Sequence, residues 1–165
     1  MVVTTSQYCA ARIRELYQVQ NSVVIPMLID LDSWRDLLTE NPAPAPTKQQ
    51  FIVLCVCRFY FRKHIDVLLH AAALLRLRVG ELEVRLVGGG PEGVRLRRLS
   101  KALHLEGTGR WLGDVTAAQL AVEYNRADVF CLASVQEGFG IVFLEAMAAG
   151  KPPRLCRKLS DTVCW

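Results

Sequence analysis

The sequence predicts a doubly wound α/β domain, in which helices cover both faces of a parallel β-sheet. From residue 51 onward, short apolar runs alternate with segments of helical periodicity, which is the pattern of repeated strand–helix units. The apolar runs are continuous, as expected of strands that are buried on both faces. A length of 165 residues, with 52% hydrophobic and 22% charged residues, suits one globular domain and excludes a mostly disordered or coiled-coil chain.

Four strand–helix units are expected in chain order. The strands are expected over residues 51–57, 83–87, 110–113 and 129–133. The helices are expected over residues 66–78, 91–105, 116–126 and 141–149. Pro91 suits a first helical turn and Thr116 an N-cap, while Gly80 and Gly150 stop the helices before them.

The N-terminal part predicts a smaller, separate β-α-β unit. Strands are expected over residues 2–5 and 23–29, around a helix over residues 6–17. Asp32 or Ser33 is expected to cap a further short helix, and a proline-rich stretch then forms a linker. The chain is thus divided into an N-terminal part, a linker, a sheet domain and a tail, over residues 1–40, 41–50, 51–152 and 153–165.

The charge distribution argues against nucleic-acid binding. The formal net charge is +4, but four basic residues against one acid (4 − 1 = +3) concentrate this excess in the last fifteen residues. Residues 1–150 therefore carry about +1, which leaves no broad basic face for a phosphate backbone.

The cysteines and the hydropathy indicate a chain of the reducing cytoplasm. Cys55, Cys57 and Cys131 lie in apolar runs and are expected to be buried thiols, and the remaining cysteines lack the spacing of zinc ligands. No metal site is therefore expected. No stretch reaches the roughly 20 apolar residues that span a bilayer, although peripheral contact with a membrane is left open.

The loop over residues 134–140 is the first candidate site. It joins the fourth strand to the last helix, at the strand end where open α/β sheets bind ligands. Gly138 and Gly140 leave N–H groups open at a helix N-terminus, which favours anionic or hydroxyl-rich ligands. Glu137 and Glu145 can accept hydrogen bonds from hydroxyls on two parts of a ligand such as a nucleotide-sugar. Alternatively, Glu145 is a solvated helix residue and Glu137 an acid favoured by the helix dipole.

Cations follow the first strand of the sheet at the same edge. Arg58 comes directly after the strand, and Lys63 stands at the start of the first helix with Arg62 beside it. A diphosphate needs fixed positive charge, for which Arg offers a fork of donors and Lys a point charge. Each of these residues can instead decorate a solvated loop, an alternative that is strongest for Arg62.

A glycine-rich loop follows the second strand. Gly88, Gly89 and Gly90 begin a GxGxxG pattern that ends at Gly93, and Asp114 lies about twenty residues further on. This pattern makes an NAD-dependent oxidoreductase an alternative. Against it, the dinucleotide fingerprint belongs in the first β-α-β unit, whereas this loop follows the second strand and contains a proline.

Three aromatic residues can stack on a base or a sugar. For Trp34 and Trp111 we expect packing against the core instead. Phe139 stands between two glycines of the candidate loop, so stacking and packing both stay open for it.

Several blocks of the sequence together resemble a known family. They are CRFYFRKHIDVLLHAAALL, VRLVGGGPEG, WLGDV, YNRADVFCLAS and QEGFGIVFLEAMAAGKP. Over residues 51–152 the chain is similar to the C-terminal, donor-binding lobe of retaining GT-B glycosyltransferases, the large GT4 group. The specific element is the E-x7-E pattern from Glu137 to Glu145, preceded by Arg58 and Lys63 in the family's order.

The resemblance implies a Rossmann-like lobe that binds a UDP-, GDP- or ADP-linked sugar and transfers the sugar with retention of configuration. Arg58 and Lys63 would neutralise the diphosphate, while Glu145 would hold the ribose hydroxyls. Glu137 would face the donor sugar. Two loops would line the donor, one at its sugar with Gly138, Phe139 and Gly140, the other beside the nucleotide with Gly88, Gly89 and Gly90. Neither metal nor cofactor is implied, because the cations stabilise the leaving diphosphate.

Both ends of the chain depart from the family pattern. Residues 1–40 resemble the end of the N-terminal, acceptor-binding lobe, but Met27 and Leu28 replace the usual Asn-Gly. After the AAGKP block the family continues into another strand, whereas this pattern breaks at Pro153. We therefore expect a truncated chain, with a β-α-β remnant of one lobe and an atypical tail. Leu155 or Val163 of that tail is expected to pair at a sheet edge at most.

Three function hypotheses follow. The chain is a glycosyltransferase acting on an unknown sugar, lipid or small-molecule acceptor; a catalytically incomplete nucleotide-sugar-binding fragment; or, as the weakest alternative, an NAD-dependent oxidoreductase. A partner chain that supplies the missing lobe is compatible with the first two.

Overall fold

The computed structural model describes residues 1–45, 49–135, 137 and 139–155. Its centre is a five-stranded parallel sheet in the order β5-β4-β3-β6-β7. The strands are β3 (Phe51–Val56), β4 (Leu82–Val87), β5 (Gly109–Gly113), β6 (Val129–Leu132) and β7 (Pro153–Leu155). The order steps outward from β3 in both directions, which is the doubly wound topology that the sequence predicts.

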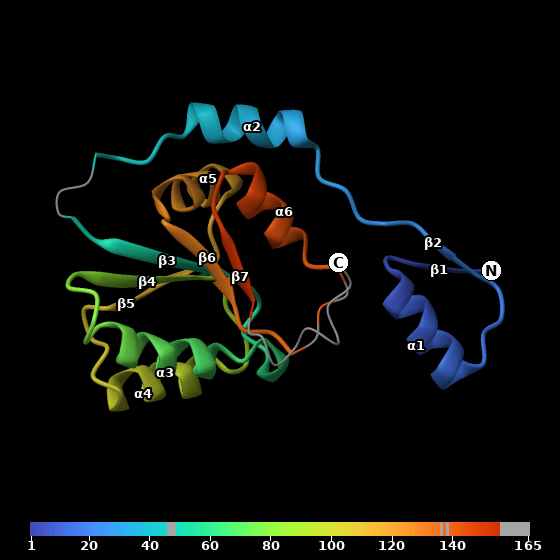
Figure 1. Cartoon of the computed structure of the whole chain (residues 1–165), viewed down its shortest axis with the longest axis horizontal. Helices are drawn as coiled ribbons and strands as arrows, with labels where there is room; N and C mark the ends of the chain where they lie inside the picture. The colour runs from blue at the N-terminus through green and yellow to red at the C-terminus, as the bar shows by residue number, and fades with distance from the viewer. Residues whose placement is uncertain (46–48, 136, 138, 156–165) are drawn as a thin grey trace.

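Helices cover both faces of this sheet. They are α3 (Ile65–Leu75), α4 (Gly93–Ala102), α5 (Ala117–Arg126) and α6 (Ile141–Ala148), with a short 3₁₀ helix η1 (Phe61–Lys63) before α3. Figure 1 shows α3 and α4 on one face and α5 and α6 on the other. The order in which strands are added to the sheet reverses between β3 and β6. Folds of this type bind ligands at such a point, beside the loops that follow the two strands.

Local signals set the limits of the helices. Thr116 and Gln119 form a capping box at the start of α5, where Thr116 Oγ1 accepts a hydrogen bond from Gln119 N at 3.2 Å. The helix expected over residues 91–105 is shorter than predicted. α4 ends at Ala102, because the backbone soon leaves the helical region and His104 takes a left-handed φ of 53°.

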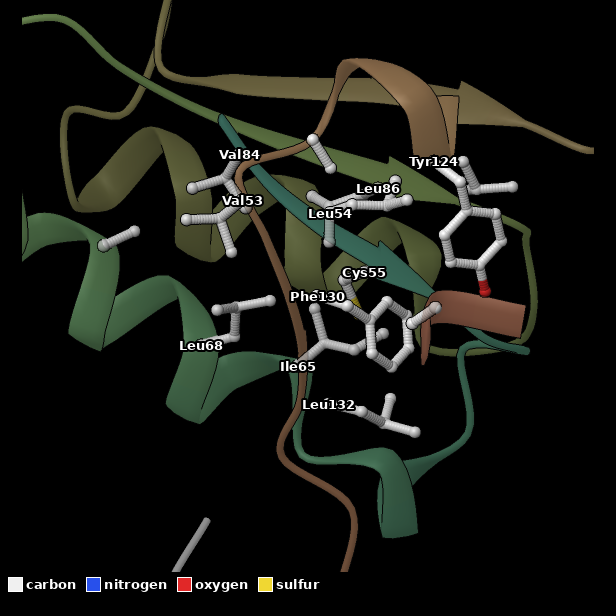
Figure 2. Packing of buried hydrophobic residues seen from close by; sticks show 14 of the residues in the cluster. Val53, Leu54, Cys55, Ile65, Leu68, Val84, Leu86, Tyr124, Phe130 and Leu132 are labelled. Atoms are coloured by element: carbon white, nitrogen blue, oxygen red, sulfur yellow. The ribbon is translucent and has the colours of Figure 1, made fainter. Parts of the chain in front are cut away.

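The hydrophobic core covers both sheet faces (Figure 2). Leu54 of β3 pairs in register with Phe130 of β6, and the Phe130 ring lies edge-on to Phe143 of α6 with 5.3 Å between the centroids. Ile65 and Leu68 bring the apolar side of α3 into the same core. Burial of each such side chain stabilises the fold by about 1.5–3 kcal/mol.

A buried ionic cluster joins β4 to α5. Arg85 of β4 is 3% exposed, and its guanidinium donates to Glu123 of α5 at 2.7 Å and also to Glu83. The strand predicted over residues 83–87 is confirmed, but its sequence gave no sign of an ion pair. Because each charge has a partner, the cluster avoids the cost of an isolated charge in a low-dielectric interior.

The N-terminal unit, defined here as residues 1–25, is a β-α-β arrangement apart from the main sheet (Figure 1). It contains β1 (Val2–Thr4), α1 (Gln7–Tyr17) and β2 (Ser22–Val24), with β1 and β2 paired in parallel. Ser6 caps α1 by accepting a hydrogen bond from Cys9 N. The strand predicted over residues 23–29 is too long, since β2 ends before Pro26, which cannot donate to a ladder.

Helix α2 (Leu31–Glu40) connects the two parts and packs on α5 and α6. Its N-cap is Asp30, which accepts a hydrogen bond from Ser33 N at 3.1 Å. The predicted caps, Asp32 and Ser33, are therefore wrong, because the helix begins before them. Trp34 lies edge-on to Tyr124 at 5.6 Å, as its predicted packing role requires. The domain limits at residues 40 and 50 stay a prediction.

The described end of the chain forms an edge strand. β7 pairs in parallel with β6, with Pro153 opposite Phe130 and Leu155 opposite Leu132. This edge position tolerates a proline at the first strand residue, and the predicted edge pairing of Leu155 is confirmed. Val163 lies outside the described residues. Across the described ranges, no helix is long and apolar enough to cross a membrane.

Candidate functional site

The candidate site lies at the carboxyl ends of the central strands. The segments after β3, β4, β5 and β6 meet there, and they hold most of the residues that the sequence singles out. The strands themselves are fixed by the ladder and by the core, so these segments start from well-defined positions.

The glycine-rich loop after β4 is packed against the backbone that follows β3. Gly88 has a φ of 109°, and a Cβ at this position would lie 2.1 Å from the carbonyl oxygen of Cys57. A Cβ at Gly90 would lie 2.8 Å from the backbone N and O of Phe59. Phe59 N donates to the Gly89 carbonyl at 2.9 Å. Gly88 and Gly90 therefore allow a close approach of two loops, which explains glycine at these two positions without a ligand.

Lys63 and Glu137 form the central contact of the site. Lys63 Nζ lies 2.5 Å from Glu137 Oε1, and the two side chains are only 11% and 9% exposed. The turn of η1 carries Lys63, and the loop after β6 carries Glu137. A carboxylate and an ammonium that are both withdrawn from water depend on each other for compensation, so loss of one leaves the other costly.

Arg58 lies at the same edge but pairs on the β5 side. Its Nη1 is 3.4 Å from Asp114 Oδ1, and the two side chains are 59% and 78% exposed. An exposed pair of this kind contributes at most about 1 kcal/mol, so the guanidinium can exchange Asp114 for another anion at little cost. Asp114, considered in the sequence only as part of a dinucleotide fingerprint, is thus the observed partner of Arg58.

Glu145 lies on α6 and faces helix α2 and the segment just before it. Tyr124 Oη donates to Glu145 Oε2 at 2.9 Å, and Trp34 Nε1 donates to the Glu145 carbonyl at 3.2 Å. Burial raises the pKa of the Glu145 carboxyl, while the Tyr124 hydrogen bond acts in the opposite direction. A cleft of about 370 Å³ opens beside this carboxylate, lined by Leu28, Ile29, Asp30, Ser33, Trp34, Leu37 and Ile141.

The remaining predicted residues contribute less. Gly140 caps α6 with a φ of 77°, a left-handed conformation that favours glycine, and a Cβ there would also lie 2.7 Å from Phe143 Cδ2. Phe139 is partly buried. Gly138 lies outside the described residues. Arg62 is exposed and stacks over the Tyr60 ring at 5.4 Å, which agrees with a surface role for its side chain.

The structure therefore unites some predicted residues and separates others. Lys63 and Glu137 are in direct contact, Arg58 is held toward β5, and Glu145 faces the cleft on α6. Sequence reasoning missed Tyr124 as the hydroxyl that orients Glu145. A helix residue of this kind gives no local signal, because its partner lies 21 positions further along the chain.

A second cleft lies at the opposite, amino-terminal edge of the sheet. It has a volume of about 610 Å³ and is bordered by Ile52 and Asp128 and by Arg85 of the buried ionic cluster. Parallel sheets of this type bind ligands at the other edge, so we place the candidate site with Lys63 and Glu137. Among the described residues, no group of three His, Cys, Asp or Glu side chains is arranged to hold a metal ion.

The doubly wound sheet, with acids and cations at its carboxyl edge, defines a Rossmann-like domain of the GT-B glycosyltransferase type. The family model described as Glycosyl transferases group 1 matches residues 39–154. The chain belongs to this family.

Two curated relatives each match most of this chain. The GDP-mannose-dependent alpha-(1-6)-phosphatidylinositol monomannoside mannosyltransferase of Mycobacterium tuberculosis is 31% identical over 92% of this chain and 42% of its own length. D-inositol 3-phosphate glycosyltransferase 2 of Catenulispora acidiphila is 34% identical over 75% of this chain and 32% of its own length. The chain therefore spans less than half the length of these relatives.

Solved structures agree with the fold. Sucrose-phosphate synthase from Thermosynechococcus elongatus matches with a TM-score of 0.75 and 29% identity, over 93% of this chain and 40% of the other. A glycosyltransferase from Rickettsia africae matches with a TM-score of 0.77 and 22% identity, over 93% of this chain and 43% of the other, which shows the fold alone.

Proposed function

We propose that this chain forms the donor-binding part of a glycosyltransferase, which moves a sugar from a nucleotide-diphosphate sugar to an acceptor hydroxyl. The observation that carries the proposal is the shielded Lys63–Glu137 pair at the carboxyl edge of the sheet. Family membership and the GDP-mannose dependence named for the mycobacterial relative support it.

In this proposal, binding of the donor replaces the ionic partners of the charged side chains in the site. The diphosphate replaces Glu137 as the partner of Lys63, and Arg58 leaves its exposed pair with Asp114 to add a second cation. Glu137 is then released to accept hydrogen bonds from hydroxyls of the donor sugar. As the bond to the sugar breaks, charge develops on the leaving diphosphate, and the two cations stabilise it without a metal ion.

Glu145 serves the nucleotide end of the donor. Its carboxylate borders the cleft between α6 and the segment before α2, and the Tyr124 hydroxyl fixes its orientation. A carboxylate held in this way accepts hydrogen bonds from the two ribose hydroxyls. Retention of configuration at the transferred sugar is part of the proposal through the family resemblance.

Calorimetric titration with GDP and with UDP tests donor binding. We expect one nucleotide to bind, and Lys63→Ala to weaken it by about tenfold to hundredfold through loss of a charge-assisted contact. Glu145→Ala weakens it as well. Arg110→Ala is the matched control, because this exposed arginine borders the cleft at the opposite edge of the sheet and should leave binding unchanged. Absence of binding by both nucleotides, or equal losses in Lys63→Ala and Arg110→Ala, would contradict the proposal.

A second candidate is a nucleotide-sugar-binding fragment that requires another chain for transfer. The observation in its favour is that the chain spans 42% of the mycobacterial relative, and transfer also requires residues that place the acceptor hydroxyl beside the donor sugar. Release of nucleoside diphosphate from GDP-mannose or UDP-sugars with a mixture of sugar and lipid acceptors separates the two. The fragment hypothesis is supported if a nucleotide-sugar binds without release of nucleoside diphosphate and an added partner chain restores that release.

A further inference from the structure

Two thiols stand side by side at the carboxyl end of β3. Cys55 and Cys57 are two positions apart, and their Sγ atoms lie 4.0 Å from each other. Cys55 is fully buried in the core, whereas Cys57 is partly exposed just beyond the last residue of the strand. Of the two residues, Cys57 is therefore the more exposed.

The backbone holds Cys57 in this position from both sides. Its N–H donates to the Val87 carbonyl at 3.1 Å, and its own carbonyl oxygen is packed against Gly88 so closely that no Cβ fits there. These two contacts constrain the backbone at Cys57. This rigidity distinguishes Cys57 from a cysteine on an exposed loop.

The surroundings of Cys57 favour its thiolate. The hydrogen bond from the Cys55 thiol lowers the pKa of Cys57, burial opposes this effect, the Lys63 ammonium lowers the pKa further and the Glu137 carboxylate raises it. The pKa of Cys55 is raised, chiefly by its hydrogen bond with Cys57 and by burial. The contact between the two sulfurs thus shifts their pKa values in opposite directions, downward for Cys57 and upward for Cys55.

We propose that Cys57 is a site of reversible thiol modification by a low-molecular-weight disulfide. The Cys57 thiolate attacks one sulfur of the disulfide, a new S–S bond forms, and the S–S bond of the reagent breaks. The departing thiolate takes up a proton from water, so that Cys57 is oxidised and the reagent is reduced. A free small thiol reverses the exchange by the same steps.

The modification would also control the donor site. A group attached to Cys57 lies next to Arg58 and within the electrostatic reach of Lys63, where the diphosphate is placed. This consequence rests on the proposed function, while the thiol site itself does not.

The test uses the aromatic disulfide 5,5′-dithiobis(2-nitrobenzoic acid), whose released thiolate absorbs light. The protein tested is the full chain with Cys9, Cys156 and Cys164 each replaced by serine, which leaves Cys55, Cys57 and Cys131 of the sheet. We expect one fast-reacting thiol, which peptide mapping places at Cys57 and which Cys57→Ser removes. Cys55→Ala should slow the reaction by about fivefold, because the donor to the thiolate is lost.

Charge variants sharpen the assignment. Lys63→Gln should slow the fast reaction and Glu137→Gln should accelerate it, with thermal melts confirming that each variant is folded. A fast phase that survives Cys57→Ser, maps to Cys131, or keeps its rate in Cys55→Ala would overturn the proposal.

Protection by nucleotide separates this proposal from the proposed function. GDP or UDP at saturation should slow the labelling of Cys57. Unchanged labelling in the presence of a nucleotide that calorimetry shows to bind would contradict the placement of the diphosphate and leave the thiol site established.

Discussion

The N-terminal unit and the sheet domain, extended here to residue 155 to include β7, share one building pattern but differ in what their sheets bury. All six residues of β4 are buried, because the sheet has helices on both faces. In the N-terminal unit, Val3 and Val23 remain 52% and 46% exposed on a two-stranded sheet with one helix. A β-α-β unit thus becomes a stable core only when a second layer closes its sheet.

Helix α2 follows one of these regions in sequence but packs on the other. It follows the N-terminal unit in sequence, yet Leu38 belongs to the core of the sheet domain and Asn125 Nδ2 donates to the Leu38 carbonyl at 2.7 Å. The cleft beside Glu145 is bounded by this helix. The site therefore depends on a segment that sequence position alone assigns to the other part of the chain.

The largest expected difference between the two regions comes from one substitution made in each. Leu54→Ala in β3 should lower the free energy of unfolding by about 2–5 kcal/mol, because Leu54 is fully buried and a cavity remains. Leu16→Ala in α1 should change it by less than about 0.5 kcal/mol, since Leu16 is 60% exposed. Urea denaturation of both variants measures the contrast, and similar losses would show that the N-terminal unit shares the core.

Most of the fold was accessible from sequence because its signals are local. The continuous apolar run at the start of the sheet domain predicted β3, and Thr116 predicted the start of α5. The predictions failed where the contact that fixes an element is distant in sequence, or where several neighbouring residues carry the same capping signal. Asp30, rather than Asp32 or Ser33, caps α2, and all three side chains are competent caps.

The sequence predicted which edge of the sheet holds the candidate site, but not which side chains are in contact there. The end of β3 and the end of β6 were expected at one edge, and there Lys63 meets Glu137 across 74 positions. The Tyr124–Glu145 and Arg58–Asp114 contacts depend on helix and loop positions that no motif encodes. The functional roles of these residues stay predictions.

Removal of one hydroxyl should have an intermediate effect. Tyr124→Phe keeps the ring contacts with Trp34 and Phe130 but loses the hydrogen bonds to Glu145 Oε2 and to the Val142 carbonyl. We expect a loss of about 1–2 kcal/mol in unfolding free energy. Tyr17→Phe in the N-terminal unit is the control and should have little effect, so equal losses in the two variants would contradict this assignment.

A smaller effect is expected for the charge of Glu145, and it depends on pH. The pKa of this carboxyl is raised in the fold, so its protonated form is favoured and its contribution to stability falls as pH rises through the folded pKa. Glu145→Gln keeps an acceptor for Tyr124 but does not titrate. Relative to the parent, the variant should therefore gain stability between pH ~4 and pH ~7, by less than about 1 kcal/mol because the group is only half-buried.

Urea curves across this pH range measure the difference. Glu106→Gln, at an exposed position, serves as the matched control and should stay within about 0.5 kcal/mol of the parent at each pH. A stability difference for Glu145→Gln that falls with rising pH would show that the carboxylate, rather than the acid, is the form the fold favours.

The smallest effect should follow from the largest change in the chain. A chain that begins at residue 26 lacks the whole N-terminal unit but keeps α2, the cleft beside Glu145 and the sheet domain. Since α1 packs on β1 and β2, its loss should change the unfolding free energy of the sheet domain by less than about 0.5 kcal/mol. Nucleotide binding should also be retained. A loss comparable to that of Leu54→Ala would mean that the two regions fold as one unit, and that the exposed valines of the N-terminal sheet are part of a shared interface.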